Sequence, residues 1–375
     1  MWFTWLCQHL VWYLFRDAGL ELGRDYTVND DSFYRDLVLR GSLGLGESYM
    51  EGKWSTTNLH YFFRCLFTAR KLQFVQWLWS WLSPVEWWRW LVVVYGPRFL
   101  VDAHKVGKVH YDLDPQLYQE MLSTPMMYSC AYWKDVETLE EAQLQKMDLL
   151  ARKLELKEGM RVLDIGCGWG DMAIFLAQKY GCKVVGLTIS KEQQRIAKER
   201  AVKAGVEDKV TYLLQDYREH REMYDRVVSI GMLEHVNFNN LTAYFKCVER
   251  FLHLGGLAVI HSITGRTNTP VGDGFISKHI FPNSAIPSHE AWISSLRPVD
   301  LEIEDIQSLG PDYSRTLEAW RVNFEKYCAG NLSLTEVRMW RYYLTASEVQ
   351  FDTRGLQLWQ VVLSSGRTTR YDAPR

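Results

Sequence analysis

The sequence predicts an α/β protein in which a doubly wound sheet forms the larger, C-terminal part and a smaller helical part precedes it. From Arg161 onward, short apolar runs alternate with helical stretches, which is typical of parallel strands joined by helices. Residues 1–120 are helical in pattern instead, and no apolar run there is followed by clustered glycines. The 375 residues suffice for two domains, which we place at 1–120 and 121–375.

The composition narrows the class of protein further. Apolar residues make up 47% and charged residues 23% of the chain, as in ordinary globular proteins, which argues against long disorder and against a polytopic membrane protein. The 43 basic and 45 acidic residues nearly cancel, so the basic surface that a nucleic acid needs is not expected. Seven cysteines without a C-x-x-C pair argue against disulfides and structural zinc, and favour a reducing, cytoplasmic setting.

Tryptophan is over-represented in the N-terminal part. The run Met1–Phe15 is rich in Trp, Phe and Leu but lacks a basic leader and a cleavage site, so we expect neither a signal peptide nor a membrane span. The stretch Leu72–Tyr95 holds six of the 16 Trp residues and is interrupted by Pro84, which favours two short helices. These helices either pack on the second domain or touch lipid headgroups.

The second part follows a regular order of strands and helices. We expect five strands, with helices in the gaps between them, at Arg161–Ile165, Lys183–Thr188, Val210–Leu214, Arg226–Ile230 and Leu257–Ser262. The helical stretches are Gly170–Lys179, Lys191–Ala204 and Asn240–Leu252. An irregular part follows, then an apolar alternation at Leu301–Ile306, a helical block at Thr316–Thr345 and a last strand at Gln357–Ser364.

A glycine turn follows the first of these strands. The strand carries Asp164 near its end and opens into Gly166, Gly168 and Gly170 before a helix. Glycines at this place let a ligand approach the backbone, and the helix N-terminus favours an anionic group. The G-x-G-x-G spacing and the preceding carboxylate suit a nucleotide-like ligand with an amino group better than one with a pyrophosphate. A tight turn without a ligand is the alternative.

Polar residues also end the next two strands. Thr188 and Ser190 end the second strand, and Gln193 lies one helical turn further on. Gln215 and Asp216 follow the third strand. Because the carboxyl ends of parallel strands meet along one crevice, Thr188 and Gln193 are expected beside a ribose, and Gln215 and Asp216 beside an adenine edge. Helix capping by Ser190 is compatible with this interpretation.

A carboxylate and two imidazoles follow the fourth and fifth strands. Glu234 and His235 stand in the segment Gly231–Val236, and His261 ends the fifth strand. They could form a metal set, a general-base set or a structural polar network. No H-x-H or H-E-x-x-H pattern accompanies them, so no metal is expected.

Together with Tyr128–Trp133, these stretches resemble one family, the cyclopropane-fatty-acyl-phospholipid synthases, which are relatives of the mycolic acid cyclopropane synthases. The D-x-G-x-G-x-G turn itself resembles the first motif of class I S-adenosylmethionine methyltransferases. The likeness extends over further motifs in order, at Gly41–Met50, His110–Leu113, Leu187–Ser190, Gln215–Tyr217, Phe281–Asn283, Asp312–Tyr313 and Leu358–Val361. It implies a class I methyltransferase Rossmann-like seven-stranded sheet with a smaller helical N-terminal domain that binds lipid.

The resemblance implies transfer of a methylene group from S-adenosylmethionine to the cis double bond of unsaturated acyl chains in membrane phospholipids. An alkene is its own nucleophile, so the protein needs a dry pocket and aromatic faces to stabilise a carbocation, with Tyr132, Trp133, Phe275 and Tyr313 as candidates. A methyltransferase that leaves a methyl branch instead of a ring is an alternative. A membrane-binding protein without catalysis is another.

Site residues carried over from the family fall into two groups. A bound bicarbonate is implied as the base, held by Cys130, Glu234, His261, the backbone at Ile263, and Tyr313. Cofactor contacts are implied at Tyr128 and Ser129 for the methionine end, at Asp164, Gly166 and Gly168 for the amino acid, and at Thr188, Gln193, Gln215, Asp216 and His235 along the rest of the cleft.

The likeness further implies a homodimer and peripheral contact with the inner face of the membrane. One departure from the pattern concerns a segment near the C-terminus, where some members carry a Cys that has been described as catalytic. Here the segment Arg341–Ser347 has Ser347 at that place. A thiol at this position is therefore not expected to be essential.

Overall fold

The computed structural model describes residues 2–71, 115–267, 272–282, 284–367 and 369–375. The Trp-rich stretch and the motif at His110–Leu113 lie outside the described residues. Two compact units divide the described chain: the first takes 2–71, 272–282 and 317–355, and the second takes 115–267, 284–316 and 356–375. The units interleave along the chain, whereas the sequence suggested a single boundary after residue 120.

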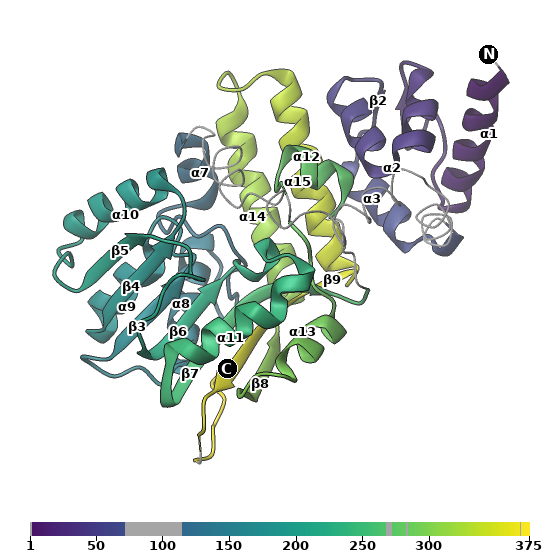
Figure 1. Cartoon of the computed structure of the whole chain (residues 1–375). Helices are drawn as coiled ribbons and strands as arrows, with labels where there is room; N and C mark the ends of the chain where they lie inside the picture. Colours follow the sequence, from purple (N-terminus) through teal and green to yellow (C-terminus); the bar gives the residue numbers. More distant parts are fainter. Residues whose placement is uncertain (1, 72–114, 268–271, 283, 368) are drawn as a thin grey trace. The chain divides into compact units, whose positions relative to one another are not determined.

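The second unit contains a seven-stranded sheet, as the resemblance implies (Figure 1). Its strand order is β5-β4-β3-β6-β7-β9-β8. β9 runs antiparallel to β7 and β8, which flank it, and all the other neighbouring strands of the sheet are parallel. The order reverses at β3, so the crevice at a topological switch point lies beyond the carboxyl end of this strand. The strands are β3 Arg161–Ile165, β4 Lys183–Thr188, β5 Val210–Leu214, β6 Tyr224–Ile230, β7 Leu252–Gly265, β8 Glu302–Ser308 and β9 Leu356–Ser364.

Helices cover both faces of this sheet. Alternate residues of each strand face opposite sides, so Val162 joins the apolar layer beneath α8, α9 and α10, and Leu163 joins the layer beneath α11 and α13. The helical elements of the unit are α7 Pro115–Leu122, α8 Leu139–Lys153, α9 Asp171–Tyr180, α10 Lys191–Lys203, η2 Leu233–His235, η3 Phe238–Asn240, α11 Leu241–Phe251 and α13 His289–Leu296.

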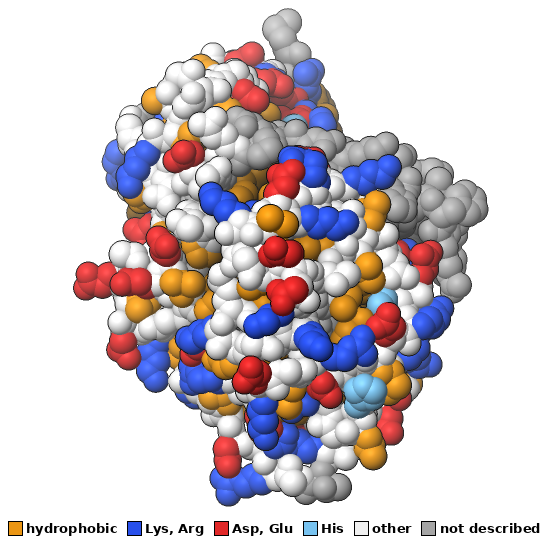
Figure 2. Space-filling model, turned by 90° about the vertical axis from the view of Figure 1, so that its left-hand side faces the viewer, with side chains coloured by type: hydrophobic (Ala, Val, Ile, Leu, Met, Phe, Trp, Pro, Cys, Tyr) orange, Lys and Arg blue, Asp and Glu red, His pale blue; other side chains and the backbone are white. Residues whose placement is uncertain are grey.

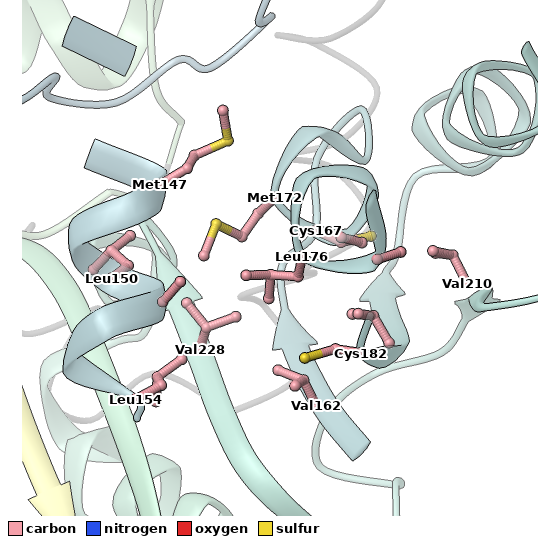
Figure 3. Close-up of a cluster of buried hydrophobic side chains, with 14 of the residues drawn as sticks. Met147, Leu150, Leu154, Val162, Cys167, Met172, Leu176, Cys182, Val210 and Val228 are labelled. Carbon is pink, nitrogen blue, oxygen red and sulfur yellow. The ribbon is translucent and has the colours of Figure 1, made fainter. Parts of the chain in front are cut away.

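The layer beneath α8 and α9 anchors both helices to the sheet. Figure 3 shows Leu150 of α8 and Leu154, directly after this helix, beside Val228 of β6, with Met172 and Leu176 of α9 next to them. Burial of such a side chain contributes about 1.5–3 kcal/mol. The loops that begin or end at these helices therefore start from fixed positions.

The first unit is mainly helical, as its sequence pattern indicates. Its buried centre is aromatic, with the rings of Trp54 and Phe62 4.5 Å apart and both almost fully buried. A pair of two-residue antiparallel strands, which the sequence did not reveal, joins its helices. Its elements are α1 Trp2–Asp17, β1 Thr27–Val28, α2 Ser32–Met50, β2 Trp54–Ser55, α3 Leu59–Thr68, α12 Gly274–His279 and α15 Leu334–Asp352.

The predicted helical block near the C-terminus consists of two helices. The first, α14 Gly310–Cys328, begins in the second unit and continues into the first. A turn follows it, and Ser333 then caps α15 through a reciprocal bond with Glu336.

Figure 2 shows basic and acidic side chains interspersed on the face of the molecule turned toward the viewer. This mixture agrees with the formal charge of −2. Among the helices that the structure describes, none is both long enough and apolar enough to span a membrane.

Candidate active site

The glycine turn lies between β3 and α9. Gly166, Gly168 and Gly170 have φ values of 80°, 53° and 90°, a region that L-residues with side chains rarely adopt. The amides of Gly166 and Cys167 both donate to the Leu187 carbonyl oxygen at 3.0 Å, which ties the turn to the end of β4. A β-carbon added at Gly168 would meet no other described residue within 4 Å, so the backbone there is open to a ligand.

Asp164 stands directly below this turn and is 1% exposed. Its Oδ2 has no hydrogen-bond partner in the described chain. Burial, helped by the nearby Asp171 carboxylate, raises the pKa of Asp164 to about 7. A buried carboxylate that lacks a partner suits the amino group of an amino-acid ligand, which would restore the missing interaction.

The ends of β4 and β5 are tied to each other. The Thr188 hydroxyl donates to Gln193 Oε1 at 2.9 Å. The backbone amide of Gln215 donates to the Thr188 carbonyl at 3.0 Å. Ser190 caps α10 by accepting the Gln193 amide at 3.3 Å, so the capping interpretation is correct for this residue. These bonds place Thr188, Gln193 and Gln215 at one edge of the sheet.

The predicted adenine contacts already have protein partners. Gln215 Oε1 lies 3.0 Å from His220 Nδ1, and the Asp216 carboxylate is bidentate with the Arg218 guanidinium, with Nε at 2.9 and 3.1 Å from the two oxygens. A role of Gln215 and Asp216 in adenine recognition remains a prediction.

The segment Tyr128–Trp133 connects α7 to α8. The Ser129 hydroxyl accepts a hydrogen bond from Lys146 Nζ at 2.8 Å, and the Ser129 carbonyl accepts one from Gln143 Nε2 at 3.0 Å. The Tyr128 ring lies 5.6 Å from that of Tyr118, centroid to centroid. Burial raises the pKa of the Cys130 thiol well above its ordinary value, so Cys130 is a neutral thiol that donates to the Ala131 carbonyl at 3.1 Å.

The first two turns of α14 hold the other end of this segment through hydrogen bonds. The Thr316 hydroxyl accepts bonds from the Ala131 amide at 3.1 Å and from Trp133 Nε1 at 2.9 Å. Asp312 accepts the Trp133 amide at 2.8 Å. Tyr313, which is almost buried, lies between Asp312 and Thr316 on the helix that anchors the Cys130 segment.

Glu234 lies in the short helix η2, after β6. Its Oε1 accepts the Ile263 amide of β7 at 2.6 Å, and its buried Oε2 has no partner in the described chain. Burial raises the pKa of Glu234 to about 7, against the bond from Ile263, which lowers it. The neighbouring His235 is half-buried, and desolvation lowers its pKa to about 4, so its imidazole is neutral near pH 7.

His261 lies on β7, two residues before Ile263. Gln360 Nε2 of β9 donates to His261 Nδ1 at 3.2 Å, so Nδ1 accepts and the imidazole proton lies on Nε2. Burial, and to a smaller extent the Lys146 ammonium, keeps the pKa of His261 well below its ordinary value. His261 therefore offers a neutral N–H at Nε2, for which the described residues provide no acceptor.

The fold brings several predicted residues together. Glu234 and His261 are connected through Ile263, while Cys130 and His261 both lie within the electrostatic influence of Lys146. Near neutral pH the linked Glu234 and His261 present a carboxyl that titrates and an N–H donor, which can hold a small oxyanion. Phe275, suggested as a carbocation contact, belongs to α12 of the first unit.

Sequence reasoning missed the residues that orient this group, namely Lys146, Gln143, Gln360, Asp312 and Thr316. A signal existed for two of them, because Gln143 and Lys146 share the helical spacing of Leu139, Met147 and Leu150, which form the buried stripe of α8. Asp312 and Gln360 stand within the family motifs Asp312–Tyr313 and Leu358–Val361, which do not by themselves indicate this role, and no local pattern marks Thr316.

The strand order, the glycine turn and the buried Asp164 define a class I S-adenosylmethionine-dependent methyltransferase. The structure of coclaurine N-methyltransferase, 22% identical, has the same fold, with a TM-score of 0.66 over 86% of this chain and 99% of that one. Within this class, residues 100–361 match the family model described as mycolic acid cyclopropane synthetase, so the chain belongs to that family. The protein is thus an S-adenosylmethionine-dependent transferase of the cyclopropane synthase family.

Individual relatives agree with this assignment. The chain is 42% identical, over 91% of its length and 88% of the relative's, to cyclopropane-fatty-acyl-phospholipid synthase of Escherichia coli K12. The structure of the cyclopropane synthase MmaA2 from Mycobacterium tuberculosis, 30% identical, aligns with a TM-score of 0.66 over 72% of this chain and all of that one. The mycolic acid cyclopropane synthase CmaA1, solved with SAH and CTAB, is 31% identical and aligns with a TM-score of 0.64 over 69% of this chain and 97% of that one.

Proposed function

We propose that this protein transfers a methylene group from S-adenosylmethionine to the cis double bond of unsaturated acyl chains in membrane phospholipids, which produces cyclopropane acyl chains. The observation that carries the proposal is the 42% identity, over nearly the full length of both chains, to an enzyme with this name. The buried polar atoms of Asp164, Glu234 and His261 support it, because each lacks a partner that the reaction's components would supply.

The cofactor would lie over the glycine turn. Asp164 Oδ2 would accept the amino group of the methionine moiety, Gly166 and Gly168 would leave room for it, and Thr188 and Gln193 would face the ribose. Tyr128 and Ser129 would close the methionine end. When bound, S-adenosylmethionine supplies an electrophilic methyl carbon.

A bound bicarbonate would be held by Cys130, Glu234, His261, Ile263 and Tyr313, and when bound it supplies the base for the final deprotonation. Two groups of this set can bind bicarbonate directly. Glu234 Oε2 can accept the hydroxyl hydrogen of bicarbonate, and the Nε2–H of His261 can donate to one of its oxygens. The Ile263 amide, which donates to Glu234 Oε1, would be shared between the carboxylate and the anion.

The aromatic side chains beside Cys130 would exclude water and stabilise positive charge on the acyl chain. Tyr132, Trp133 and Tyr313 are nearly buried, and the indole of Trp133 is fixed by its bond to Thr316. Their π faces attract a cation without offering it a nucleophile that would trap it.

The test is incubation of the purified protein with vesicles of an unsaturated phospholipid and methyl-labelled S-adenosylmethionine, followed by lipid mass spectrometry. We expect acyl chains that have gained one CH₂ and lost the double bond. Vesicles of a fully saturated phospholipid serve as the control. Unchanged unsaturated lipid, in protein shown by calorimetry to bind the cofactor, would refute the proposal.

A second candidate is a methyltransferase that leaves a methyl branch. It is favoured by a 38% identity, over 70% of this chain and 69% of the relative, to a probable fatty acid methyltransferase of Pseudomonas putida. The same experiment separates the two, because a saturated methyl branch adds two hydrogens beyond the CH₂, and a methylene branch keeps an alkene.

The substrate implies where the protein works. We place it in the cytoplasm, in peripheral contact with the inner face of the membrane, and as a homodimer. Light scattering of the purified protein tests the dimer, which a single species of about 44.0 kDa would exclude.

A further inference from the structure

Lys146 is a fully buried lysine on α8 that the proposed chemistry does not yet use. Its side chain has 0% exposure, and its one hydrogen bond among the described residues is the 2.8 Å bond from Nζ to the Ser129 hydroxyl. Such burial is costly for an ammonium without a counter-ion. It also lowers the pKa of Lys146 to about 7.

The charged groups around Lys146 do not neutralise it. Asp171 of α9 acts on it from a distance, but the Asp171 carboxylate is already bidentate with Arg200 of α10, at 2.5 and 2.7 Å. Cys130, in the segment before α8, is a neutral thiol, and His261 on β7 is a neutral imidazole. The described residues therefore give the Lys146 ammonium no carboxylate of its own.

The anion subsite of the proposed function lacks a positive charge. It consists of a thiol, a titrating carboxyl, a neutral imidazole, a backbone amide and a phenol, and none of these carries a positive charge. A small anion held in a dry site needs such a charge nearby. Lys146 interacts electrostatically with two members of the subsite, Cys130 and His261.

We propose that Lys146 supplies the positive charge of this anion subsite and, through its hydrogen bond to Ser129, positions the segment that carries Cys130. Lys146 is thus a positioning residue for the transfer reaction. The inference rests on the proposed function and adds to it the residue that makes anion binding favourable.

The test compares Lys146→Met, which keeps the length of the side chain and removes its charge, with Lys146→Arg, which keeps the charge. Lys153→Met is the matched control, because Lys153 is equally buried on the same helix and also lowers the pKa of His261, though less than Lys146 does, but has a carboxylate, Asp305, 3.5 Å from its Nζ. Sodium bicarbonate is titrated calorimetrically into each protein saturated with S-adenosylhomocysteine. Thermal melting shows that each variant is folded.

We expect Lys146→Met to bind bicarbonate at least about tenfold more weakly, because the buried anion loses a nearby positive charge. Affinity for S-adenosylhomocysteine should change little, turnover at low bicarbonate should fall, and Lys146→Arg should recover part of the anion affinity. Lys153→Met should lose clearly less bicarbonate affinity than Lys146→Met, because Asp305 offsets the charge of Lys153.

Ser129→Ala separates charge from positioning, because it removes the hydroxyl and keeps the ammonium. It should weaken cofactor binding, and because the ammonium stays it should lower bicarbonate affinity much less than Lys146→Met does. It also provides the test if Lys146→Met does not fold, because a loss of bicarbonate affinity of about tenfold or more in Ser129→Ala would show that the hydrogen bond, and not the charge, holds the anion.

Two results overturn the inference. If the wild type makes cyclopropane lipid and binds bicarbonate, and folded Lys146→Met binds it equally well, Lys146 has only a structural role and the proposed function stands. If the wild type makes the lipid but does not bind bicarbonate, both the anion and the role of Lys146 fall. If the wild type makes no product yet loses bicarbonate affinity with Lys146→Met, the proposed function fails alone.

Discussion

At the scale of single residues, buried polar atoms without partners mark the site. Asp164 Oδ2, Glu234 Oε2 and His261 Nε2 are all inside the second unit, and none has a hydrogen-bond partner in the described chain. A group of this kind costs free energy in the protein alone, and a ligand that completes its hydrogen bonds recovers it. Their ionisation should therefore change when ligands bind.

The first prediction concerns the pH dependence of cofactor binding. Asp164 has a pKa of about 7, so its carboxylate is charged above this pH and becomes neutral below it. Because the charged form attracts the ligand's ammonium group, affinity for S-adenosylhomocysteine should fall about tenfold for each pH unit below 7. Calorimetry at several pH values measures this. Asp164→Asn should bind weakly at every pH, and a flat profile in the wild type would contradict the assignment.

The second prediction separates turnover from cofactor affinity. Glu234→Gln and His261→Ala remove groups assigned to the anion, so turnover should fall by about 10² to 10⁴ while affinity for S-adenosylhomocysteine stays within a few fold. Steady-state kinetics and calorimetry together measure both quantities. Loss of cofactor binding with normal turnover per bound cofactor would show that these residues hold the cofactor instead.

The third prediction concerns Ser347, which is half-buried on α15. Because no thiol stands there, Ser347→Ala should keep turnover within about tenfold of the wild type. A loss of more than about a hundredfold in a folded variant would assign a catalytic role to this position.

At the scale of elements, the glycine turn joins local geometry to packing. A β-carbon added at Gly170 would lie 2.4 Å from the Tyr212 hydroxyl oxygen and 3.0 Å from the Ala197 β-carbon, so this end of α9 fits against β5 and α10 only without a side chain. The Tyr212 hydroxyl donates to the Gly170 carbonyl at 3.1 Å, and this bond holds the Tyr212 side chain close to the Gly170 backbone.

The fourth prediction uses a matched pair of glycines. Gly170→Ala should cost about 1–2 kcal/mol for its positive φ and about 1–3 kcal/mol for overpacking. Gly159 has a similar φ of 81° but open space around it. Gly159→Ala should therefore lose only the free energy that the positive φ costs. Urea denaturation gives both free energies of unfolding. Equal losses would show that Tyr212 moves aside without cost.

At the scale of the whole molecule, α1 leaves an aromatic face exposed. Cys7, Val11, Leu14 and Phe15 face the interior of the first unit, while Trp2, Trp5 and Trp12 are 75%, 54% and 45% exposed. Exposed Trp side chains on an amphipathic helix are typical of contact with lipid headgroups. This face is therefore a candidate for the membrane contact that the proposed function requires.

The fifth prediction tests this contact. Trp5→Ser combined with Trp12→Ser should weaken sedimentation with phospholipid vesicles several-fold without lowering the melting temperature, because both side chains are exposed. Leu334→Ser, at a side chain 67% exposed on α15, is the control and should sediment like the wild type. Equal sedimentation of all three proteins would remove α1 from the membrane contact.

The sequence by itself determined five strands and a last strand of the sheet, the glycine turn and the polar residues at the strand ends, because strand alternation, glycine spacing and strand ends are properties of neighbouring residues. The structure's strands β3, β4 and β5 have the predicted bounds, and β7 differs only by extending further at both ends. The residues proposed for the site could therefore be named from the sequence, and their roles stay predictions.

Only the tertiary structure decided how these residues are charged and held. The proton of His261 is placed by Gln360, which is 99 residues away, and the 130–133 segment is held by α14, more than 170 residues away. The buried Lys146 bonds to Ser129, 17 residues earlier, and is influenced by Asp171 of α9. The physical reason is that desolvation and hydrogen bonding, which set the pKa of each group, arise from neighbours in space and not from neighbours in the chain.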